Sequence, residues 1–210
     1  MPLDVAVLEP EISNSSTESL DVIRAALETI VAIPDDEWNR LAAHRGIVQI
    51  ERGHHLLRIG DTVDHLYFIH SGALRVYYVH DGIEHTRSFA FENRFYTNSY
   101  SLHTRTPSHY AVQALEDTVL SAIPYAIIEE AQDRHPCWER IGRVQANQSF
   151  IAKEQKEMEM RIYSPEERYR QLVDSDSPLV RRVPLYHLAS YLGITPETLS
   201  RIRGRIGRSW

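Results

Sequence analysis

The sequence predicts an α+β protein in which a small β-roll, a long amphipathic helix and a C-terminal helix-turn-helix follow one another along the chain. Three observations support this prediction. Short β-branched and aromatic runs separated by turns fill residues 46–123, a heptad repeat covers 136–162, and two amphipathic segments flank Gly193. We therefore expect four parts: a flexible arm over 1–19, a β-roll (jelly roll) with flanking helices over 20–135, a dimerisation helix over 136–162, and a helix-turn-helix domain over 163–210.

The composition is that of an ordinary soluble protein, and it excludes several classes of site. The 210 residues are 42% hydrophobic and 25% charged, and no stretch approaches the roughly 18 apolar residues that a membrane-spanning helix needs. The N-terminus, MPLDVAVLEPEISNSS, lacks the basic and apolar regions of a secretory signal. A single cysteine, Cys137, excludes an intramolecular disulfide, a zinc ribbon and a cysteine-ligated iron–sulfur cluster. We therefore expect a cytoplasmic protein without membrane association.

The N-terminal region is expected to be a flexible arm followed by two short helices. Residues 1–19 are polar and rich in serine, which is typical of flexible chain ends. Apolar residues at helical spacing then predict a helix over 20–33. Pro34 and three acidic residues open a second helix over 35–44, because negative charge in a first turn suits the positive end of the helix dipole.

Turn residues punctuate the predicted β-roll about every 8–12 residues. Asp81-Gly82 separates two of the runs and predicts a hairpin, because glycine accepts the positive φ that a tight turn requires. Strands at this spacing without intervening helices are typical of a β-barrel or jelly roll. The predicted strands are His65–His70, Ala73–His80, Ile83–Phe91, His109–Leu115 and Val119–Ile123.

The helix over 136–162 carries one seam with alternating steps of three and four residues. A seam of this kind is the contact surface of a coiled coil, so we expect a homodimer; packing of the helix on its own β-roll is the alternative. Two seam positions are glutamines, which could pair across a dimer axis and fix the register. The seam consists of Ile141, Val144, Gln148, Ile151, Gln155, Met158 and Ile162.

The C-terminal segment predicts a helix-turn-helix. Ser164 and Pro165 begin a helix to about Val173, and a polar loop follows over 174–178. Two further helices then flank Gly193, which suits the left-handed backbone of a helix end. Ala189 is small enough for a close helix crossing, and Thr195 and Pro196 are a good N-cap and first residue for the second helix, whose buried stripe is Leu199, Ile202 and Ile206.

The opposite face of the second helix carries the chemistry of base and phosphate contacts. Glu197 and Arg201 are four residues apart; arginine can contact guanine O6 and N7, and glutamate can accept from cytosine N4. Residues 179–210 carry a balance of +5 and residues 1–178 one of −11, so the tip suits an anionic partner. A helical hairpin with solvated arginines is the alternative. The predicted DNA-binding residues are Thr195, Glu197, Thr198, Ser200, Arg201, Arg203, Arg205 and Arg208.

Taken in order, these parts resemble the Crp/Fnr family of bacterial transcription regulators over about residues 20–206. The residues that carry the resemblance are Gly53, Arg58-Ile59-Gly60-Asp61, Leu66-Tyr67-Phe68-Ile69, Ser71-Gly72 and Pro196-Glu197-Thr198-Leu199-Ser200-Arg201. The resemblance implies a cyclic-nucleotide-binding-like β-roll and base reading by Glu197 and Arg201. It also implies double-stranded DNA and a second copy of the chain as partners, with RNA polymerase as a further candidate.

The chain departs from the family pattern where a cyclic nucleotide would bind. The family's ribose-binding glutamate aligns with Asn98, and its phosphate-binding arginine aligns with Ser108. An unpaired buried phosphate is strongly disfavoured, so we expect no cyclic AMP and no other cofactor; Arg105 or His109 is the alternative phosphate partner. The effector is left unknown. The candidate pocket for another small molecule consists of Tyr96, Asn98, Ser99, Ser108, His109 and Tyr110.

Two further departures concern the iron–sulfur cluster and the β-hairpin wing that related regulators contain. Cys137 alone cannot hold an oxygen-sensing iron–sulfur cluster. Only Gly207 to Trp210 follow the second helix, so we expect the β-hairpin wing of the family's DNA-binding domain to be absent.

Two other function classes stay open beside DNA binding. One is a small-molecule-binding β-roll without DNA binding. The other is a cupin-like metalloenzyme, since eight of the eleven histidines lie in or beside the β-roll; no His-x-His pair occurs, and we expect no metal. The chain has no nucleophile-elbow, P-loop, dinucleotide-binding or zinc-protease motif, so we expect no enzyme and no catalytic residue. Cys137 is expected to be packed rather than reactive.

Overall fold

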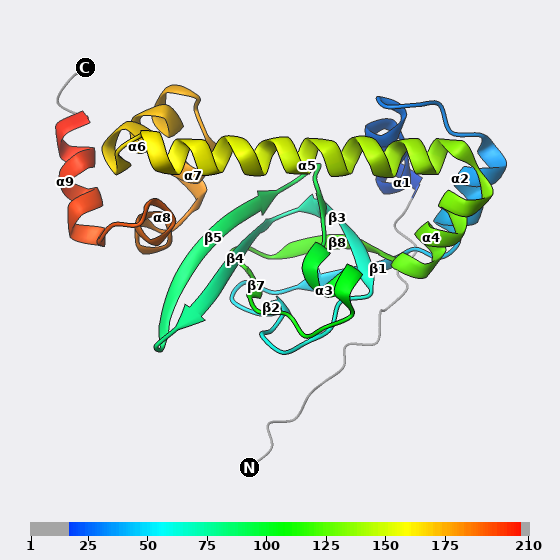
Figure 1. The fold of residues 1–210 in the computed structure, drawn as a ribbon, viewed down its shortest axis with the longest axis horizontal. Helices are drawn as coiled ribbons and strands as arrows, with labels where there is room; N and C mark the ends of the chain where they lie inside the picture. The colour runs from blue at the N-terminus through cyan, green and yellow to red at the C-terminus, as the bar shows by residue number, and fades with distance from the viewer. Residues whose placement is uncertain (1–16, 207–210) are drawn as a thin grey trace, which may run out of the picture.

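A computed structural model describes residues 17–206, and its parts lie along one long helix, α5 (Figure 1). The helices are α1 (Thr17–Glu28), α2 (Asp35–Ala42), α3 (Ser99–Thr104), α4 (Tyr125–Arg134), α5 (Pro136–Ile162), α6 (Pro165–Asp174), α7 (Pro178–Arg182), α8 (Leu185–Leu192) and α9 (Pro196–Ile206). The strands are β1 (Gly46–Ile50), β2 (His55–Leu57), β3 (His65–Ser71), β4 (Ala73–His80), β5 (Ile83–Phe91), β6 (Phe95–Tyr96), β7 (Ala111–Ala114) and β8 (Thr118–Pro124).

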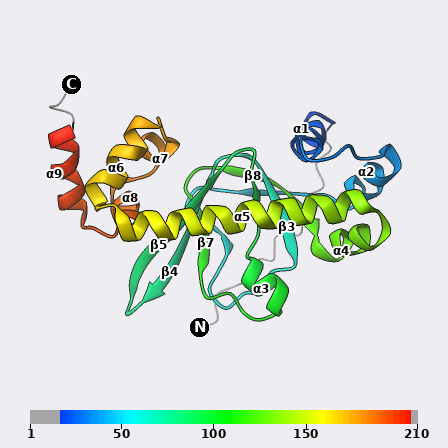
Figure 2. The same ribbon diagram turned by 45° about the horizontal axis from the view of Figure 1, so that its top comes forward.

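Two views agree on how these elements are arranged. Helices α1, α2 and α4 gather at one end of α5, the β-roll lies beside its middle, and α6 to α9 lie at the other end (Figures 1 and 2). The predicted α+β fold is therefore confirmed. Residues 17–19 were expected in the arm but belong to α1, and the rest of the predicted arm lies outside the described residues.

The β-roll consists of two four-stranded antiparallel sheets with the orders β1-β8-β3-β6 and β2-β7-β4-β5. Between them lie Leu74, Val76, Val112 and Leu120, which are almost fully buried. The predicted hairpin is confirmed: β4 and β5 pair from Ala73–Phe91 to His80–Ile83, and both Asp81 and Gly82 have positive φ.

Some elements differ from the sequence prediction. The strands β1, β2 and β6 and the helices α3 and α7 were not predicted, and of these β2 and β6 span too few residues to show a clear period. The polar loop expected over 174–178 ends where Pro178 starts α7, with Ser177 as its N-cap. The long helix has the predicted bounds, since α5 spans Pro136–Ile162.

Gly72 fixes the turn between β3 and β4. Its φ of +95° lies in the region that favours glycine, and a Cβ there would overlap the Thr118 hydroxyl and the Asp117 carbonyl of the neighbouring turn. The chain can therefore fold back at this point only with glycine, which accounts for the Ser71-Gly72 turn that the sequence indicates.

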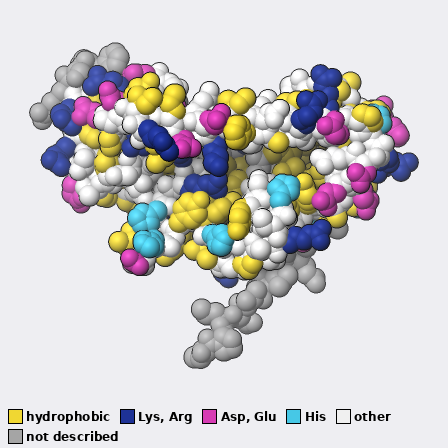
Figure 3. Space-filling model, viewed as in Figure 1, with side chains coloured by type: hydrophobic (Ala, Val, Ile, Leu, Met, Phe, Trp, Pro, Cys, Tyr) yellow, Lys and Arg dark blue, Asp and Glu magenta, His cyan; other side chains and the backbone are white. Residues whose placement is uncertain are grey.

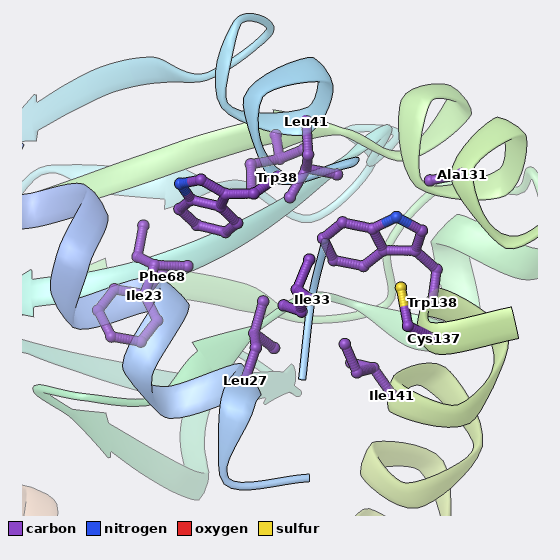
Figure 4. Packing of buried hydrophobic residues seen from close by; sticks show 11 residues of the cluster. Ile23, Leu27, Ile33, Trp38, Leu41, Phe68, Ala131, Cys137, Trp138 and Ile141 are labelled. Carbon is purple, nitrogen blue, oxygen red and sulfur yellow. The ribbon is translucent and has the colours of Figure 1, made fainter. Parts of the chain in front are cut away.

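The first turns of α5 are part of a compact helical core. Cys137, Trp138 and Ile141 pack among buried apolar residues of α1, α2 and the β-roll (Figure 4). Glu37 of α2 is only 4% exposed, and it accepts bonds from Arg134 Nε (2.9 Å), Arg134 Nη2 (3.0 Å) and Trp138 Nε1 (2.8 Å). A buried carboxylate that accepts two bonds from a guanidinium and one from an indole N–H ties α2, α4 and α5 together.

A candidate nucleic-acid interface

The turn between α8 and α9 has the local geometry that a helix-turn-helix needs. Gly193 ends α8 with a φ of +72°, and the next amide, of Ile194, donates to the Ala189 carbonyl at 3.0 Å. Ala189 is fully buried, so the absence of a larger side chain allows α9 to cross α8 closely. The predicted helix-turn-helix is therefore present in the fold.

Helix α9 begins with the expected cap and buries the expected stripe. The Thr198 amide donates to the Thr195 hydroxyl at 3.2 Å, which satisfies one of the free amides of the first turn. Leu199, Ile202 and Ile206 are buried against α6 and α8. Burial of this face directs the opposite face of the helix to solvent.

The exposed face of α9 carries the predicted base-reading residues. Glu197, Ser200 and Arg201 are all exposed, and Arg201 Nη2 donates to the Thr198 hydroxyl at 3.1 Å. The Glu197 pKa is lowered by its own backbone amide and by the Thr195 hydroxyl, with a smaller effect from Arg201. Glu197 is therefore an ionised acceptor near neutral pH, beside an arginine that forms no ion pair with any of residues 17–206.

The arginines predicted as phosphate contacts lie in two different environments. Arg203 is exposed and forms no ion pair within the described part of the chain. Arg205 Nη2 lies 2.6 Å from a carboxylate oxygen of Glu166 on α6. Arg208 lies outside the described residues. Basic side chains are visible at the end of the molecule that α9 forms (Figure 3).

Intramolecular pairing reduces the positive charge of the C-terminal tip below what the sequence indicates. Besides Arg205, Arg181 lies 2.5 Å from Asp176, and Arg182 lies 2.6–2.7 Å from Glu92 and Glu116. The charge that stays available to an anionic partner is therefore concentrated on Arg201 and Arg203, with Arg205 available only if its ion pair opens.

The ion pairs of Arg182 join the helix-turn-helix domain to the β-roll. Arg182 of α7 donates to both oxygens of Glu92 and of Glu116 and to the Gly72 carbonyl. At a second point of contact, the Thr86 amide of β5 donates to the Ser190 hydroxyl of α8 at 2.9 Å. Sequence reasoning missed these contacts, because the partners lie 66 to 110 residues apart and no local pattern marks them.

The predicted ligand pocket is closed by bonds among its own residues. Asn98 caps α3 and donates through Nδ2 to the Ser108 hydroxyl at 2.7 Å, and that hydroxyl donates to the Tyr110 carbonyl at 2.6 Å. Ser99 and His109 of the predicted set are exposed, as is Arg105. Asn98 and Ser108 are thus brought together, but they hold the backbone rather than a ligand.

Aromatic side chains occupy the space beside these residues. Burial, with a smaller effect from the neighbouring Tyr110, raises the pKa of Tyr96 well above its usual value. The Arg87 guanidinium lies 5.0 Å over the ring of Tyr110. A groove of about 840 Å³ opens elsewhere, along β1 and β2, and its lining includes His55 and Tyr67 but none of the six predicted pocket residues.

The residues of the predicted dimer seam differ in burial along α5. Ile141 is buried within its own chain, which corrects the expectation that it faces a second copy, and Val144 is half-buried. The other seam residues are exposed, and so is every residue from 146 to 155. Nothing in the described chain therefore covers the middle of the helix.

The other candidate sites have the following surroundings. The histidines visible in Figure 3 are spread over several places, and residues 17–206 contain no cluster of three or more metal-ligating side chains. Burial raises the pKa of the Cys137 thiol, which makes the reactive thiolate scarce. Within the same range, no helix is both long and apolar enough to cross a membrane.

Comparisons with known proteins give a consistent result. Residues 47–135 match the model of the cyclic nucleotide-binding domain. The chain is 27% identical to the fumarate and nitrate reduction regulatory protein of Vibrio cholerae, over 76% of this chain and 68% of that protein. It is 26% identical to the anaerobic regulatory protein of Pasteurella multocida, over 75% of this chain and 61% of that protein.

Two solved structures share the fold over most of the chain. FixK2 from Bradyrhizobium japonicum matches with a TM-score of 0.62 and 19% identity, covering 79% of this chain and 85% of that one. DNR from Pseudomonas aeruginosa matches with a TM-score of 0.55 and 18% identity, covering 94% of this chain and 90% of that one. At these identities the likeness concerns the fold, including the order of β-roll, long helix and C-terminal helices.

Proposed function

We propose that this chain, which belongs to the Crp/Fnr family of transcription regulators, acts as a homodimer that reads an inverted repeat in double-stranded DNA with helix α9. The observation that carries the proposal is the division of α9 into two faces. Leu199, Ile202 and Ile206 anchor one face, while Glu197 and Arg201 lie exposed on the other without an ion pair to any other described element. An anchored helix with such a face suits the major groove.

The charged residues of α9 have the following proposed roles. Arg201 donates to guanine O6 and N7, and Glu197 accepts from cytosine N4. Arg203 contacts phosphates, and Arg205 joins it when its bond to Glu166 is exchanged for a phosphate. Because this exchange replaces one ion pair by another, Arg205 should contribute less to affinity than Arg203.

The exposed middle of α5 supports the dimer. Phe150 and Ile151 are more than half exposed, as are Met160 and Ile162, although all are apolar. Of these, Ile151 and Ile162 belong to the heptad seam, and exposed apolar side chains at heptad spacing are best covered by a second copy of the same helix. A two-fold dimer would place two α9 helices about one turn of DNA apart, which requires an inverted repeat.

The β-roll is proposed to act without cyclic AMP and without a bound cofactor. The positions that align with the family's glutamate and arginine are Asn98 and Ser108, which are buried and bonded to each other. A cyclic phosphate placed there would lie in a buried site without a cation. The effector stays unknown, RNA polymerase is a further candidate partner, and no catalytic step is proposed.

Selection of bound duplexes from a random DNA pool tests this function. We expect the full chain, without added effector and at near-physiological salt, to enrich an inverted repeat with half-sites about one helical turn apart. Arg201→Ala should then lose about 1–3 kcal/mol at one base pair of each half-site and tolerate other bases there. The matched variant Arg203→Ala should weaken binding to all sequences alike and reduce the salt dependence.

Two results would count against the proposal. If no sequence is enriched, either the helix-turn-helix does not read DNA or an effector is obligatory, and both contradict the function as stated. If Arg201→Ala weakens all duplexes equally, Arg201 is a phosphate contact and the base-reading assignment is wrong.

A further inference from the structure

A second, small cavity lies where the long helix meets the helix-turn-helix domain. Its volume is about 260 Å³, and its polar lining comes from Lys156 and Glu159 on α5, Arg168 and Gln171 on α6, Ser175 after α6, and Tyr191 on α8. It shares no residue with the exposed face of α9 or with the predicted pocket of the β-roll. Its walls therefore come from the long helix α5 and from the C-terminal helices α6 and α8.

Lys156 is a cation with little compensation in this cavity. Its ammonium group donates to the Arg87 carbonyl of β5, and the Tyr191 ring covers it at 4.2 Å. No carboxylate among residues 17–206 lies within ion-pair distance of it. Burial and the positive charges of Arg87 and Arg168 lower the Lys156 pKa to about 8, which is the effect of an unpaired cation in a partly dry site.

Arg168, the second cation in the lining, has only part of its hydrogen-bonding capacity satisfied. Its Nη2 donates to the Leu192 carbonyl at 2.8 Å, which caps the end of α8. Its Nε is buried and has no acceptor in the described chain. A buried N–H of a charged group without an acceptor is costly, so the site favours any acceptor that can reach it.

We infer that this cavity binds a small oxyanion, either a phosphate group or a carboxylate, between Lys156 and Arg168. Two cations and a single carboxylate, that of Glu159, line the space, so one bound negative charge would balance it. The oxyanion would accept from Arg168 Nε and from the ammonium of Lys156, and the amide of Gln171 is a further donor in the lining. The volume lies just below that of typical ligand pockets, which suits inorganic phosphate or a small organic acid.

The position of the cavity gives such an anion a mechanical consequence. Lys156 belongs to α5, whereas Arg168 belongs to α6, and the chain between the two helices passes through Tyr163 in an extended conformation. An anion bound by both cations would therefore favour the present angle between α5 and the helix-turn-helix. The effect on DNA binding rests on the proposed function, but the anion site itself does not.

Isothermal titration calorimetry on the full-length chain tests the site directly. Sodium phosphate and sodium acetate are titrated separately, each against sodium chloride of equal ionic strength, so that the two arms distinguish a phosphate from a carboxylate. We expect saturable binding of at least one anion. Lys156→Gln should weaken it at least tenfold, whereas Lys153→Gln, which removes an exposed lysine of the same helix, should leave it unchanged.

Further variants keep the result interpretable. Arg168→Gln should also lose binding, with Arg170→Gln, an exposed arginine of α6, as its match. Because Arg168 bonds the end of α8, circular dichroism must show that its variant is folded; Lys156→Gln carries the test if it is not. Arg201→Ala should bind the anion normally, which separates the cavity from the surface arginines of α9.

Three outcomes decide between the claims. The site is overturned if no anion binds beyond the chloride control, or if Lys153→Gln loses as much affinity as Lys156→Gln. If the anion binds but leaves the affinity for a selected duplex unchanged, the regulatory role is overturned and the site stands. If the anion binds as expected while no duplex is ever selected, the proposed DNA-binding function fails and the anion site is unaffected.

Discussion

The first turns and the middle turns of α5 both carry large apolar residues but have opposite surroundings. At the start of the helix, Cys137, Trp138 and Ile141 are each about 95% buried among α1, α2 and α4. In the middle turns, Phe150 and Ile151 are equally apolar and more than half exposed. The comparison shows that a heptad pattern states which face of a helix is apolar, but not whether the same chain or another covers that face.

The charged residues near the first turns and near the far end of α5 also differ in how well their charges are compensated. At the first end, Glu37 is fully compensated by Arg134 and Trp138. At the far end, Lys156 and Arg168 share a cavity without an ion pair to any of residues 17–206. The first end is complete within one chain, whereas the second has both apolar and charged groups that a partner or ligand could satisfy.

The largest expected effect concerns Trp138. Replacing it with alanine should lower the free energy of unfolding by about 3–5 kcal/mol, because a large buried ring and its bond to Glu37 are both lost. Urea denaturation at low protein concentration measures this change. Phe150→Ala is the matched control and should change the monomer by about 0.5 kcal/mol or less. Equal losses would mean that the middle turns pack within their own chain.

A smaller effect is expected at Glu37. Glu37→Gln should cost about 3 kcal/mol at neutral pH, at the low end for a broken buried pair, because Arg134 is partly exposed and can regain water. Denaturation of both proteins at pH 7 measures the cost. Glu51→Gln, at an exposed site, should have little effect.

The same carboxylate predicts a pH dependence. The bond to Arg134, with help from Trp138, lowers the Glu37 pKa from its usual 4.5 to about 2. The folded state therefore binds its proton less readily than the unfolded state. The stability that Glu37 contributes is complete above pH 4.5 and is lost as the pH falls toward 2. Glu37→Gln should remove that part of the acid sensitivity, and a full acid transition in the variant would contradict it.

The sequence predicted local features well where one element carries its own signal. The Asp81-Gly82 hairpin, the bounds of α5, and the Gly193 turn with its Thr195 cap follow from backbone and capping preferences within a few residues. The exposure of Arg201 followed from the buried stripe on the other side of α9. In each case the physical cause lies inside one helix or turn.

Features that depend on distant residues were beyond such reasoning. Asn98 and Ser108 looked like pocket residues, but their shapes and polarity also allow them to bond each other. Arg182 looked like part of a basic tip, yet Glu92 and Glu116 neutralise it from the β-roll. Ile141 fitted the seam, but its burial depends on α1 and α2, which the heptad does not describe.

A moderate effect is expected at Ile151. Ile151→Ala should weaken self-association about tenfold, or about 1.4 kcal/mol, because part of the apolar seam is removed. Analytical ultracentrifugation over a range of concentrations measures the constant. The stability extrapolated to low concentration should stay unchanged, in contrast to Trp138→Ala. Lys153→Gln lies off the seam and should associate normally; if Ile151→Ala did so too, another surface would form the dimer.

The smallest effect is expected at Gln155. A substitution there tests whether this residue sets the register of the two helices in the dimer. Gln155 is exposed in one chain and would face its counterpart across a two-fold axis. Gln155→Leu exchanges a hydrogen bond worth about 1 kcal/mol for apolar contact, so the dimer constant should change little. The register should become less well defined, because leucine packs in several alignments where paired amides prefer one. A disulfide between two copies of a cysteine placed at exposed position 147 should then form rapidly and in high yield in the parent, and more slowly and in lower yield in the variant. Equal rates and yields in both would show that the register is set elsewhere along α5.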